Sequence, residues 1–211
     1  MLAQMNAVVG DIDRNIYMMH EAIKHADGHH ADMIVFPELC LTGYPPRDLL
    51  TQGAFLKKVA DGLETLKKVS KVYPNMGILF GAPLSHQNKG KGLYNAALFY
   101  VGGQCTFVYR KQLLPTYDVF DESRYFDVGE SAGVFDFKSH LLGITICEDA
   151  WGPSDLTFHD YDTSPIDELK QSELTLMINL SASPYQLGKD LRSEEHTSEL
   201  QSPCNLVCRL L

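Results

Sequence analysis

Three side chains that could act as a base, a cation and a nucleophile each follow a short apolar stretch. Glu38 comes after IVFP, Lys111 after FVYR and Cys147 after GITI. Such apolar stretches are typical of buried strands, and open sheets collect ligands outside the carboxyl ends of their strands. We therefore expect a carboxylate, an ammonium and a thiol, far apart in the sequence, to converge on one pocket.

Each of these residues also has a purely structural interpretation. A free cysteine such as Cys147 is most often a small buried hydrophobe, a strand-end lysine is usually solvated, and Glu38 could be an ordinary loop carboxylate. The neighbouring residues weaken those interpretations, because Lys111 precedes the apolar turn QLLP and Glu38 lies between Pro37 and the apolar LCL. A buried Glu38 beside a buried Lys111 would form a charge pair.

Two carboxylates directly follow the cysteine, at Glu148 and Asp149. By themselves they would raise the pKa of the Cys147 thiol and make it less reactive. A reactive thiol at this position therefore needs a cation or a base from elsewhere in the chain, which Lys111 and Glu38 could supply.

Four motifs occur in the order of a known family. The segments FPEL, RKQLLPTYDVFDESRYF and ICEDAW resemble the three signature regions of the nitrilase superfamily of carbon-nitrogen hydrolases. The longer stretches PELCLTGYPPRDLL and NLSASPYQLGK are similar to the glutaminase domains of glutamine-dependent NAD synthetases. The resemblance runs from about residue 2 to residue 191 and implies an α/β fold, the nitrilase-type α-β-β-α sandwich, with a Glu-Lys-Cys triad.

The resemblance also implies a role for each matched residue. Glu38 corresponds to the general base, Lys111 to the second triad member and Cys147 to the nucleophile that attacks the glutamine side-chain amide. The Lys111 ammonium and the backbone N–H of Glu148 would stabilise the oxyanion. Glu122 corresponds to a second glutamate that orients the lysine, with Asp118 and Asp121 as nearby competitors. The residues matching glutamine-contacting positions are Tyr117, Ser183 and Lys189.

Partners and cofactors follow from the same resemblance. We expect glutamine as the substrate, no cofactor or metal in this domain, and ammonia transfer to a synthetase domain that amidates deamido-NAD. ATP and magnesium would be needed only by that synthetase domain, whose serine- and glycine-rich pyrophosphate loop is missing here. The family is commonly homo-oligomeric.

Three other interpretations remain open at this stage. The chain could be a stand-alone amidase acting on another amide, or a catalytically impaired fragment with a binding or assembly role. A metal site at His25 and His29, near His30, has helical i, i+4 spacing but lacks the carboxylates or cysteines that would support it.

Composition narrows the classes of partner and the compartment. The formal net charge of −9 over 211 residues argues against nucleic acid or an anionic membrane as partner. No apolar run approaches the roughly 20 residues that a membrane span requires. Five widely spaced cysteines, an odd number, fit the reducing cytoplasm better than a disulfide framework.

Helical and strand patterns predict the elements that must position these residues. Apolar residues at three- and four-residue steps predict two helices, and short apolar or alternating runs predict strands that include two hairpins. The expected helices cover residues 14–26 and 55–73, and the expected strands cover 2–9, 32–36, 76–84, 93–101, 104–110, 134–137, 141–146 and 174–180. This mixture indicates layered mixed sheets.

The sequence predicts a boundary near residue 191. The peptide RSEEHTSELQS, which begins at Arg192, resembles a translated sequencing-library adapter, so we expect residues 192–211 to be a non-native tail and 1–191 a partial glutaminase domain. The two cysteines of that tail, Cys204 and Cys208, should then have no function. We expect this C-terminally incomplete domain to make no NAD alone.

Overall fold

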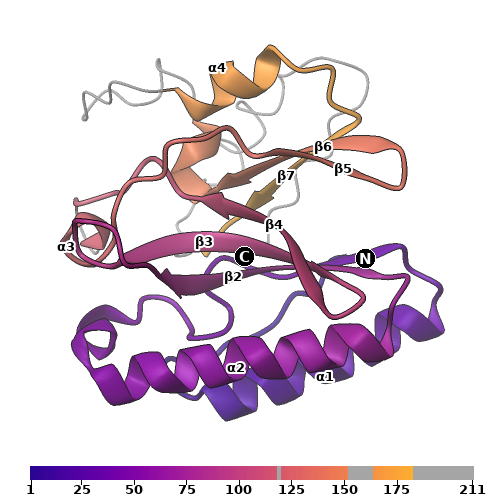
Figure 1. Cartoon of the computed structure of the whole chain (residues 1–211), viewed down its shortest axis with the longest axis horizontal. Helices are drawn as coiled ribbons and strands as arrows, with labels where there is room; N and C mark the ends of the chain where they lie inside the picture. The colour runs from indigo at the N-terminus through magenta and orange to yellow at the C-terminus, as the bar shows by residue number, and fades with distance from the viewer. Residues whose placement is uncertain (118–119, 152–163, 183–211) are drawn as a thin grey trace, which may run out of the picture.

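Four layers of helix and sheet stack on one another in the computed structural model, which describes residues 1–117, 120–151 and 164–182. Helices α1 (Ile12–Gly28) and α2 (Gly53–Val72) form the first layer, and two sheets form the second and third (Figure 1). The short helix α4 (Pro165–Lys170) lies on the far side of the second sheet. The layering confirms the α-β-β-α order expected from the sequence.

The first sheet contains four strands in the order β1-β2-β3-β4. Their bounds are Met33–Val35, Gly77–Ser85, Leu93–Val101 and Gln104–Arg110. The β1–β2 pair is parallel, and the other two pairs are antiparallel. Gly102 and Gly103 join β3 to β4 with φ angles of 58° and 82°, which glycine adopts without strain. The predicted hairpin is therefore confirmed.

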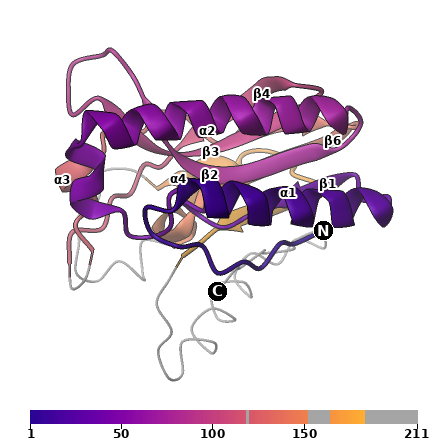
Figure 2. The ribbon, with the colours of Figure 1, turned by 90° about the horizontal axis from the view of Figure 1, so that it is seen from below.

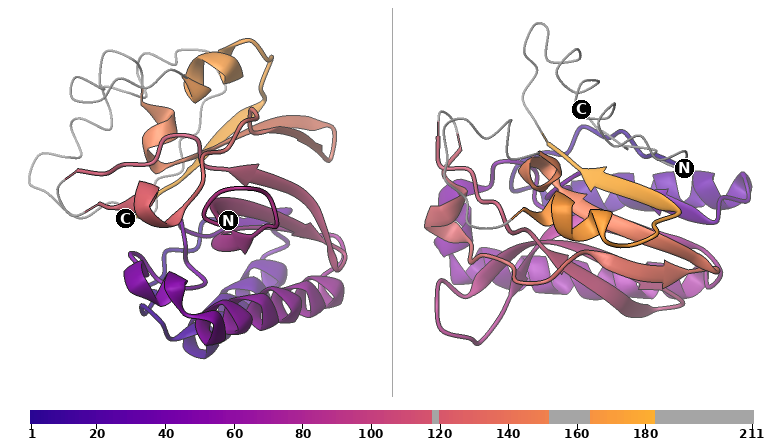
Figure 3. Two further views of the ribbon diagram at one scale, coloured as in Figure 1. Left: turned by 60° about the vertical axis from the view of Figure 1, so that its left-hand side comes forward. Right: turned by 90° about the horizontal axis from the view of Figure 1, so that it is seen from above.

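The second sheet contains β5 (Val134–Phe137), β6 (His140–Ile146) and β7 (Leu176–Leu180). Strands β5 and β6 form an antiparallel hairpin, and β6 pairs in parallel with β7. The two sheets lie face to face, as the further views in Figure 3 show. Their facing side chains form a continuous apolar layer whose buried members include Leu79, Phe99, Ile144 and Ile178.

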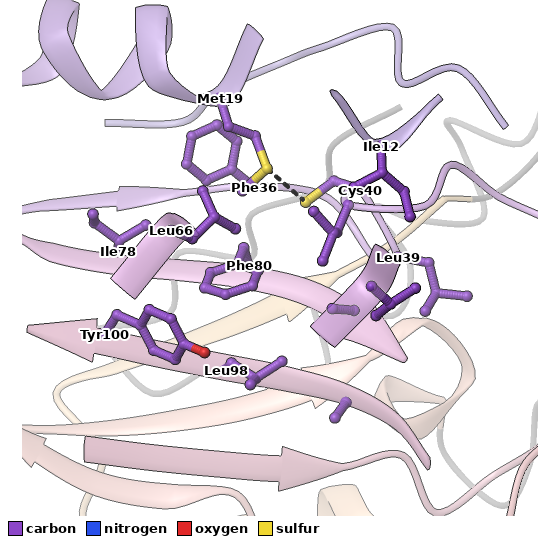
Figure 4. Packing of buried hydrophobic residues seen from close by; sticks show 14 of the residues in the cluster. Ile12, Met19, Phe36, Leu39, Cys40, Leu66, Ile78, Phe80, Leu98 and Tyr100 are labelled. Carbon is purple, nitrogen blue, oxygen red and sulfur yellow. Dashed lines mark hydrogen bonds between the residues drawn. The ribbon is translucent and has the colours of Figure 1, made fainter. Parts of the chain in front are cut away.

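The two long helices cover the other face of the first sheet, where Figure 2 shows them side by side. Helix α1 begins at an Asp11 cap, whose carboxylate accepts a hydrogen bond from the Arg14 backbone N–H at 3.1 Å. Apolar residues at helical spacing, including Met19, pack onto strand residues such as Phe80 (Figure 4). In that layer the thiol of Cys40 lies 4.0 Å from the sulfur of Met19.

One predicted strand is wrong. Residues 2–9 form a single parallel bridge, between Leu2 and Val35, and no strand. Further along this segment, the backbone N–H and carbonyl of Val8 bond to the Asn15 side chain at 2.8 and 2.9 Å. That side chain from α1 therefore occupies the hydrogen-bonding groups that a neighbouring strand would need.

Several short helical turns were not predicted from the sequence because each is too short to show a helical period. Besides α4, they are η1 (Arg47–Thr51), α3 (Glu122–Tyr125) and η2 (Cys147–Ala150). Two of them, α3 and η2, carry predicted site residues. Within the parts of the chain that the structure describes, no helix has the length and apolar character needed to cross a membrane.

Candidate active site

The turn after β1 carries Glu38 into the interior, where the residue is 2% exposed. This turn lies directly on strand β2, because the backbone N–H of Gly81 donates to the Pro37 carbonyl and the Leu41 N–H donates to the Gly81 carbonyl. A Cβ on Gly81 would collide with the backbone of Glu38 and Leu39. The absence of a side chain at Gly81 is therefore what lets the Glu38 turn approach the sheet.

Lys111 follows β4 immediately and is fully buried. Its backbone N–H donates to the Asn95 carbonyl at 2.9 Å, which holds the strand end in place. The Lys111 ammonium lies 2.8 Å from Oε1 of Glu38 and 2.9 Å from Oε1 of Glu122. The charge pair expected between Glu38 and Lys111 is thus present, and a second carboxylate joins it.

Glu122 reaches the lysine, whereas its competitor Asp121 does not. Asp121 lies 3.8 Å from Arg124 and faces the surface. Glu122 is the first residue of α3, is 4% exposed, and also accepts a hydrogen bond from the Tyr44 hydroxyl at 2.8 Å. Asp118, the other competitor, lies outside the described residues.

Asn95 is a site residue that the sequence analysis missed. It is fully buried in β3, and its amide nitrogen donates to Oε1 of Glu38 at 2.8 Å and to Oε2 of Glu122 at 3.2 Å. Asn95 and Lys111 therefore bridge the same two carboxylates. An asparagine within the apolar run LYNAALFYV was a usable signal, since a buried amide requires polar partners. Tyr44, in the sequence GYPP, had no comparable signal.

Burial and mutual attraction set the proton affinities of this cluster. Burial raises the pKa of Glu38, although Lys111 and the Asn95 hydrogen bond act in the opposite direction. Burial alone would lower the pKa of Lys111, but the carboxylates of Glu122 and Glu38 outweigh it and hold that pKa well above its ordinary value. The cluster therefore combines a permanent ammonium with a carboxylate that binds a proton more readily than usual.

Cys147 lies at the junction of β6 and η2 and is 8% exposed. Its φ of 50° is a left-handed conformation, which is unfavourable for a residue with a Cβ and occurs often at functional sites. The amide of Asn179, in β7, donates to the Cys147 carbonyl at 3.3 Å. A thiolate at Cys147 is close enough to Lys111 to add to the rise in the lysine pKa.

The remaining predicted residues divide between described and undescribed parts of the chain. The Tyr117 hydroxyl donates to Oε2 of Glu148 at 3.0 Å, and Glu148 is 1% exposed. Tyr117 therefore contacts the residue that directly follows Cys147. Ser183 and Lys189 lie outside the described residues, as does the suspected tail, 192–211.

The histidines considered as a metal site do not converge with other ligands. His25, in the last turn of α1, and His29, the residue after that helix, are both exposed, with ring centroids 4.2 Å apart, and Nδ1 of His29 lies 2.9 Å from the His25 carbonyl oxygen. Across the described residues, no group of three His, Cys, Asp or Glu side chains is arranged to hold a metal ion.

Curated relatives of this chain include glutamine-dependent NAD(+) synthetases from several bacteria. The glutamine-dependent NAD(+) synthetase of Synechocystis sp. is 39% identical over 195 residues, which cover 89% of this chain and 34% of that protein. The enzyme of the same name from Thermotoga maritima is 37% identical over 198 residues, covering 93% of this chain and 32% of that protein. The chain thus spans about a third of the length of these curated relatives.

Solved structures agree with this match. The glutamine-dependent NAD+ synthetase of Acinetobacter baumannii, solved with ADP, has a TM-score of 0.80 at 32% identity and covers 94% of this chain and 35% of its own. A Nesterenkonia amidase of the nitrilase superfamily has a TM-score of 0.77 at 16% identity, covering 99% of this chain and 74% of its own, which shows the shared fold. A family model for carbon-nitrogen hydrolases matches residues 2–163. The chain therefore belongs to the carbon-nitrogen hydrolase family and has the nitrilase-superfamily fold.

Proposed function

We propose that this chain hydrolyses the side-chain amide of glutamine at Cys147 and supplies the ammonia for ATP-dependent amidation of deamido-NAD to NAD. The observation that supports this most is the buried cluster of Glu38, Lys111 and Glu122 next to a thiol held in a left-handed turn. The names of the relatives, which are glutamine-dependent NAD synthetases, support the choice of glutamine.

The reaction begins with proton transfer from the Cys147 thiol to the Glu38 carboxylate. Burial raises the pKa of Glu38, which brings its proton affinity closer to that of a thiol and makes the transfer less uphill. The Lys111 ammonium stabilises the resulting thiolate. The sulfur then forms a bond to the amide carbon of glutamine, and the carbonyl π electrons move onto the oxygen.

Breakdown of the tetrahedral intermediate releases ammonia. The oxyanion is stabilised by the Lys111 ammonium and by the backbone N–H of Glu148. As the carbon–nitrogen bond breaks, Glu38 returns its proton to the leaving nitrogen, and a thioester to Cys147 remains. Glu38 next takes a proton from water, the hydroxide oxygen attacks the thioester carbon, and the protonated Glu38 restores the thiol as glutamate leaves.

The remaining assignments of the proposal concern substrate binding and the rest of the pathway. Tyr117, Ser183 and Lys189 contact glutamine, and the charge of Lys189 pairs with the substrate α-carboxylate. ATP and magnesium act in a synthetase domain outside this chain. Homo-oligomerisation and a cytoplasmic location remain predictions from the sequence.

Substitution of Cys147, with substitution of Cys105 as a control, tests the proposal. Cys147→Ser should lower the rate of ammonia release from glutamine by on the order of a thousandfold or more, because a serine hydroxyl is a far weaker nucleophile. Cys105→Ser is the matched control, since Cys105 is exposed in β4, and should leave the rate unchanged. Mass spectrometry of the acid-quenched reaction should detect the glutamyl thioester on the peptide that contains Cys147.

A substrate panel separates the proposal from its alternatives. Glutamine, asparagine, acetamide and acetonitrile should be supplied at equal concentration, with ammonia and the acid product measured. Faster hydrolysis of acetamide or acetonitrile than of glutamine would favour a stand-alone amidase or nitrilase. Turnover of none of the four, by a chain that is folded by circular dichroism, would favour the binding or assembly role.

A further inference from the structure

Asp149, two residues after Cys147, is fully buried and has no role in the reaction described above. Its Oδ1 accepts two backbone hydrogen bonds from another part of the chain, at 3.1 Å from Gln112 and at 2.7 Å from Leu113. These two residues directly follow Lys111. One oxygen of the carboxylate is therefore bound to the chain immediately after the lysine.

The second oxygen of Asp149 binds residues that precede Cys147 and Lys111 in the sequence. Its Oδ2 accepts the backbone N–H of Ile146 at 3.2 Å and the hydroxyl of Tyr109 at 2.9 Å. Ile146 directly precedes Cys147, and Tyr109 lies two residues before Lys111. The four donors thus come from the chain on both sides of the lysine and from the residue before the cysteine.

From this geometry we propose that Asp149 is a positioning residue, which sets the separation between the Cys147 sulfur and the Lys111 ammonium. The proposal rests on the proposed function, in which these two groups act together. Lys111 follows a strand of the first sheet and Cys147 follows a strand of the second. Ladder hydrogen bonds fix strands within one sheet, so the spacing between sheets must be set by side-chain contacts such as this one.

The left-handed backbone of Cys147 is a second reason why the hydrogen bonds of Asp149 matter. A non-glycine residue at φ 50° tends to relax unless its surroundings hold it. Asp149 lies in the same 3-10 turn as Cys147 and accepts the backbone N–H of Ile146, the residue before Cys147. This hydrogen bond holds the turn in its left-handed conformation. Burial raises the pKa of Asp149 to about 7, while Lys111 and the hydrogen bonds oppose that rise.

Asp149→Asn perturbs this anchor with almost no change in volume. One side of the new carboxamide is an NH2 group, which cannot accept a hydrogen bond. In one orientation it faces the N–H of Ile146, and in the other it faces the N–H groups of Gln112 and Leu113. In either case at least one buried backbone donor loses its acceptor and the turn loosens.

The pH dependence of Cys147 alkylation distinguishes positioning from a simple charge effect. Removing the negative charge of Asp149 would by itself favour the thiolate and lower the midpoint pH. Moving the Lys111 ammonium away from the sulfur would disfavour the thiolate and raise the midpoint. We expect the second effect to dominate in Asp149→Asn, with a midpoint about one pH unit higher than in the unsubstituted chain.

The experiment measures iodoacetamide labelling of each cysteine between pH 5.5 and 10, with mass spectrometry of the separate peptides. Exposed Cys105 is an internal reference for reagent activity. Cys40 reports folding, because it is buried and burial raises its pKa to about 12, so rapid labelling of Cys40 indicates an unfolded chain.

Two further variants complete the design. Tyr109→Phe removes one of the four donors and should shift the midpoint in the same direction by a smaller amount. Asp127→Asn is the matched control, because Oδ2 of Asp127 accepts the backbone N–H groups of Lys91 and Gly92 at 2.7 and 3.0 Å in a different loop. The midpoint of Cys147 labelling should not change in Asp127→Asn.

An unchanged or lower midpoint in Asp149→Asn, with Cys40 still protected, overturns the proposal. If Asp149→Asn exposes Cys40, then Tyr109→Phe decides: a raised midpoint supports positioning and an unchanged midpoint overturns it. Glutamine kinetics separate this proposal from the proposed function, since positioning predicts a lower kcat with an almost unchanged KM. A raised midpoint in a chain that hydrolyses no glutamine would refute the function and leave the positioning role standing.

Discussion

Asn95 joins Glu38 to Glu122, and Asn95→Leu removes both of these hydrogen bonds while keeping the same number and branching of side-chain heavy atoms. Hydrogen bonds to charged groups contribute about 1.5–3 kcal/mol each. The bond to Glu122, at 3.2 Å, is long for such a contact, so most of the effect comes from the 2.8 Å bond to Glu38. Within the described chain, Oδ1 of Asn95 has no hydrogen-bond partner, and its removal returns part of the loss. We expect the free energy of unfolding to fall by about 1–3 kcal/mol at pH 7.5.

The sign of the pH dependence follows from Glu38. Its pKa in the folded protein is raised above the ordinary value of 4.5, and the Asn95 hydrogen bond acts to lower it. In Asn95→Leu the pKa of Glu38 therefore rises further. A raised carboxyl pKa contributes stability below the unfolded pKa and loses it as the pH rises through the folded pKa. The deficit of Asn95→Leu should thus grow as the pH rises through the folded pKa of Glu38, which lies above 4.5, and should be smaller at lower pH.

The assay is urea unfolding of three variants at pH 5 and pH 7.5. Asn95→Asp should lose about 3–5 kcal/mol at pH 7.5, because it removes the donors and adds a third buried carboxylate. Asn15→Leu is the control, since Asn15 is fully buried in α1 and its side chain bonds, among the residues that the structure describes, to backbone groups of Val8 and Leu41, which do not titrate. A deficit of Asn95→Leu that is equal at the two pH values would refute the reasoning, as would an Asn95→Asp variant as stable as Asn95→Leu.

Two further substitutions test the turn and the hydroxyl that hold the carboxylates. Gly81→Ala should lower the free energy of unfolding by about 1–3 kcal/mol in urea and reduce glutamine hydrolysis, because its Cβ meets the backbone of Glu38. Gly28→Ala, in open space at the end of α1, should be neutral or stabilising by up to about 1 kcal/mol, and an equal loss in both would contradict this account. Tyr44→Phe removes a donor from Glu122 and should destabilise the protein by about 1–2 kcal/mol in the same assay. No destabilisation would show that this hydrogen bond contributes nothing.

The long periodic elements were predictable from the sequence. The expected helix at 55–73 is α2 (Gly53–Val72), and the hairpin at 93–101 and 104–110 has the bounds predicted. These elements bury one stripe or one face, so their apolar spacing records the structure directly. Residues 2–9 also have an apolar composition, but a side chain from α1 takes the hydrogen bonds of Val8 there, and no local pattern reveals that competition.

The site residues could be predicted from the sequence only where a reactive side chain follows directly after an apolar run. Glu38, Lys111 and Cys147 satisfy that condition, and their catalytic roles remain predictions. Asn95 contacts Glu38 because its side chain points from β3 toward that residue. The register of β3 against β2 sets this direction, and the local sequence does not reveal the register. Asp149 was recognised as a carboxylate beside the cysteine, but its four donors come from segments 3 to 40 residues away and depend on how the two sheets face each other.

The backbone N–H of Ala182 donates to Oε2 of Glu38 at 3.1 Å, across 144 residues of sequence. A nascent chain therefore cannot complete the surroundings of Glu38 until nearly the whole described domain has left the ribosome. In the mature protein, the hydrogen-exchange rate of the Ala182 amide reports whether this contact with Glu38 is formed. Breaking this hydrogen bond would expose the Ala182 amide hydrogen to exchange and remove a donor from Glu38 at the same time.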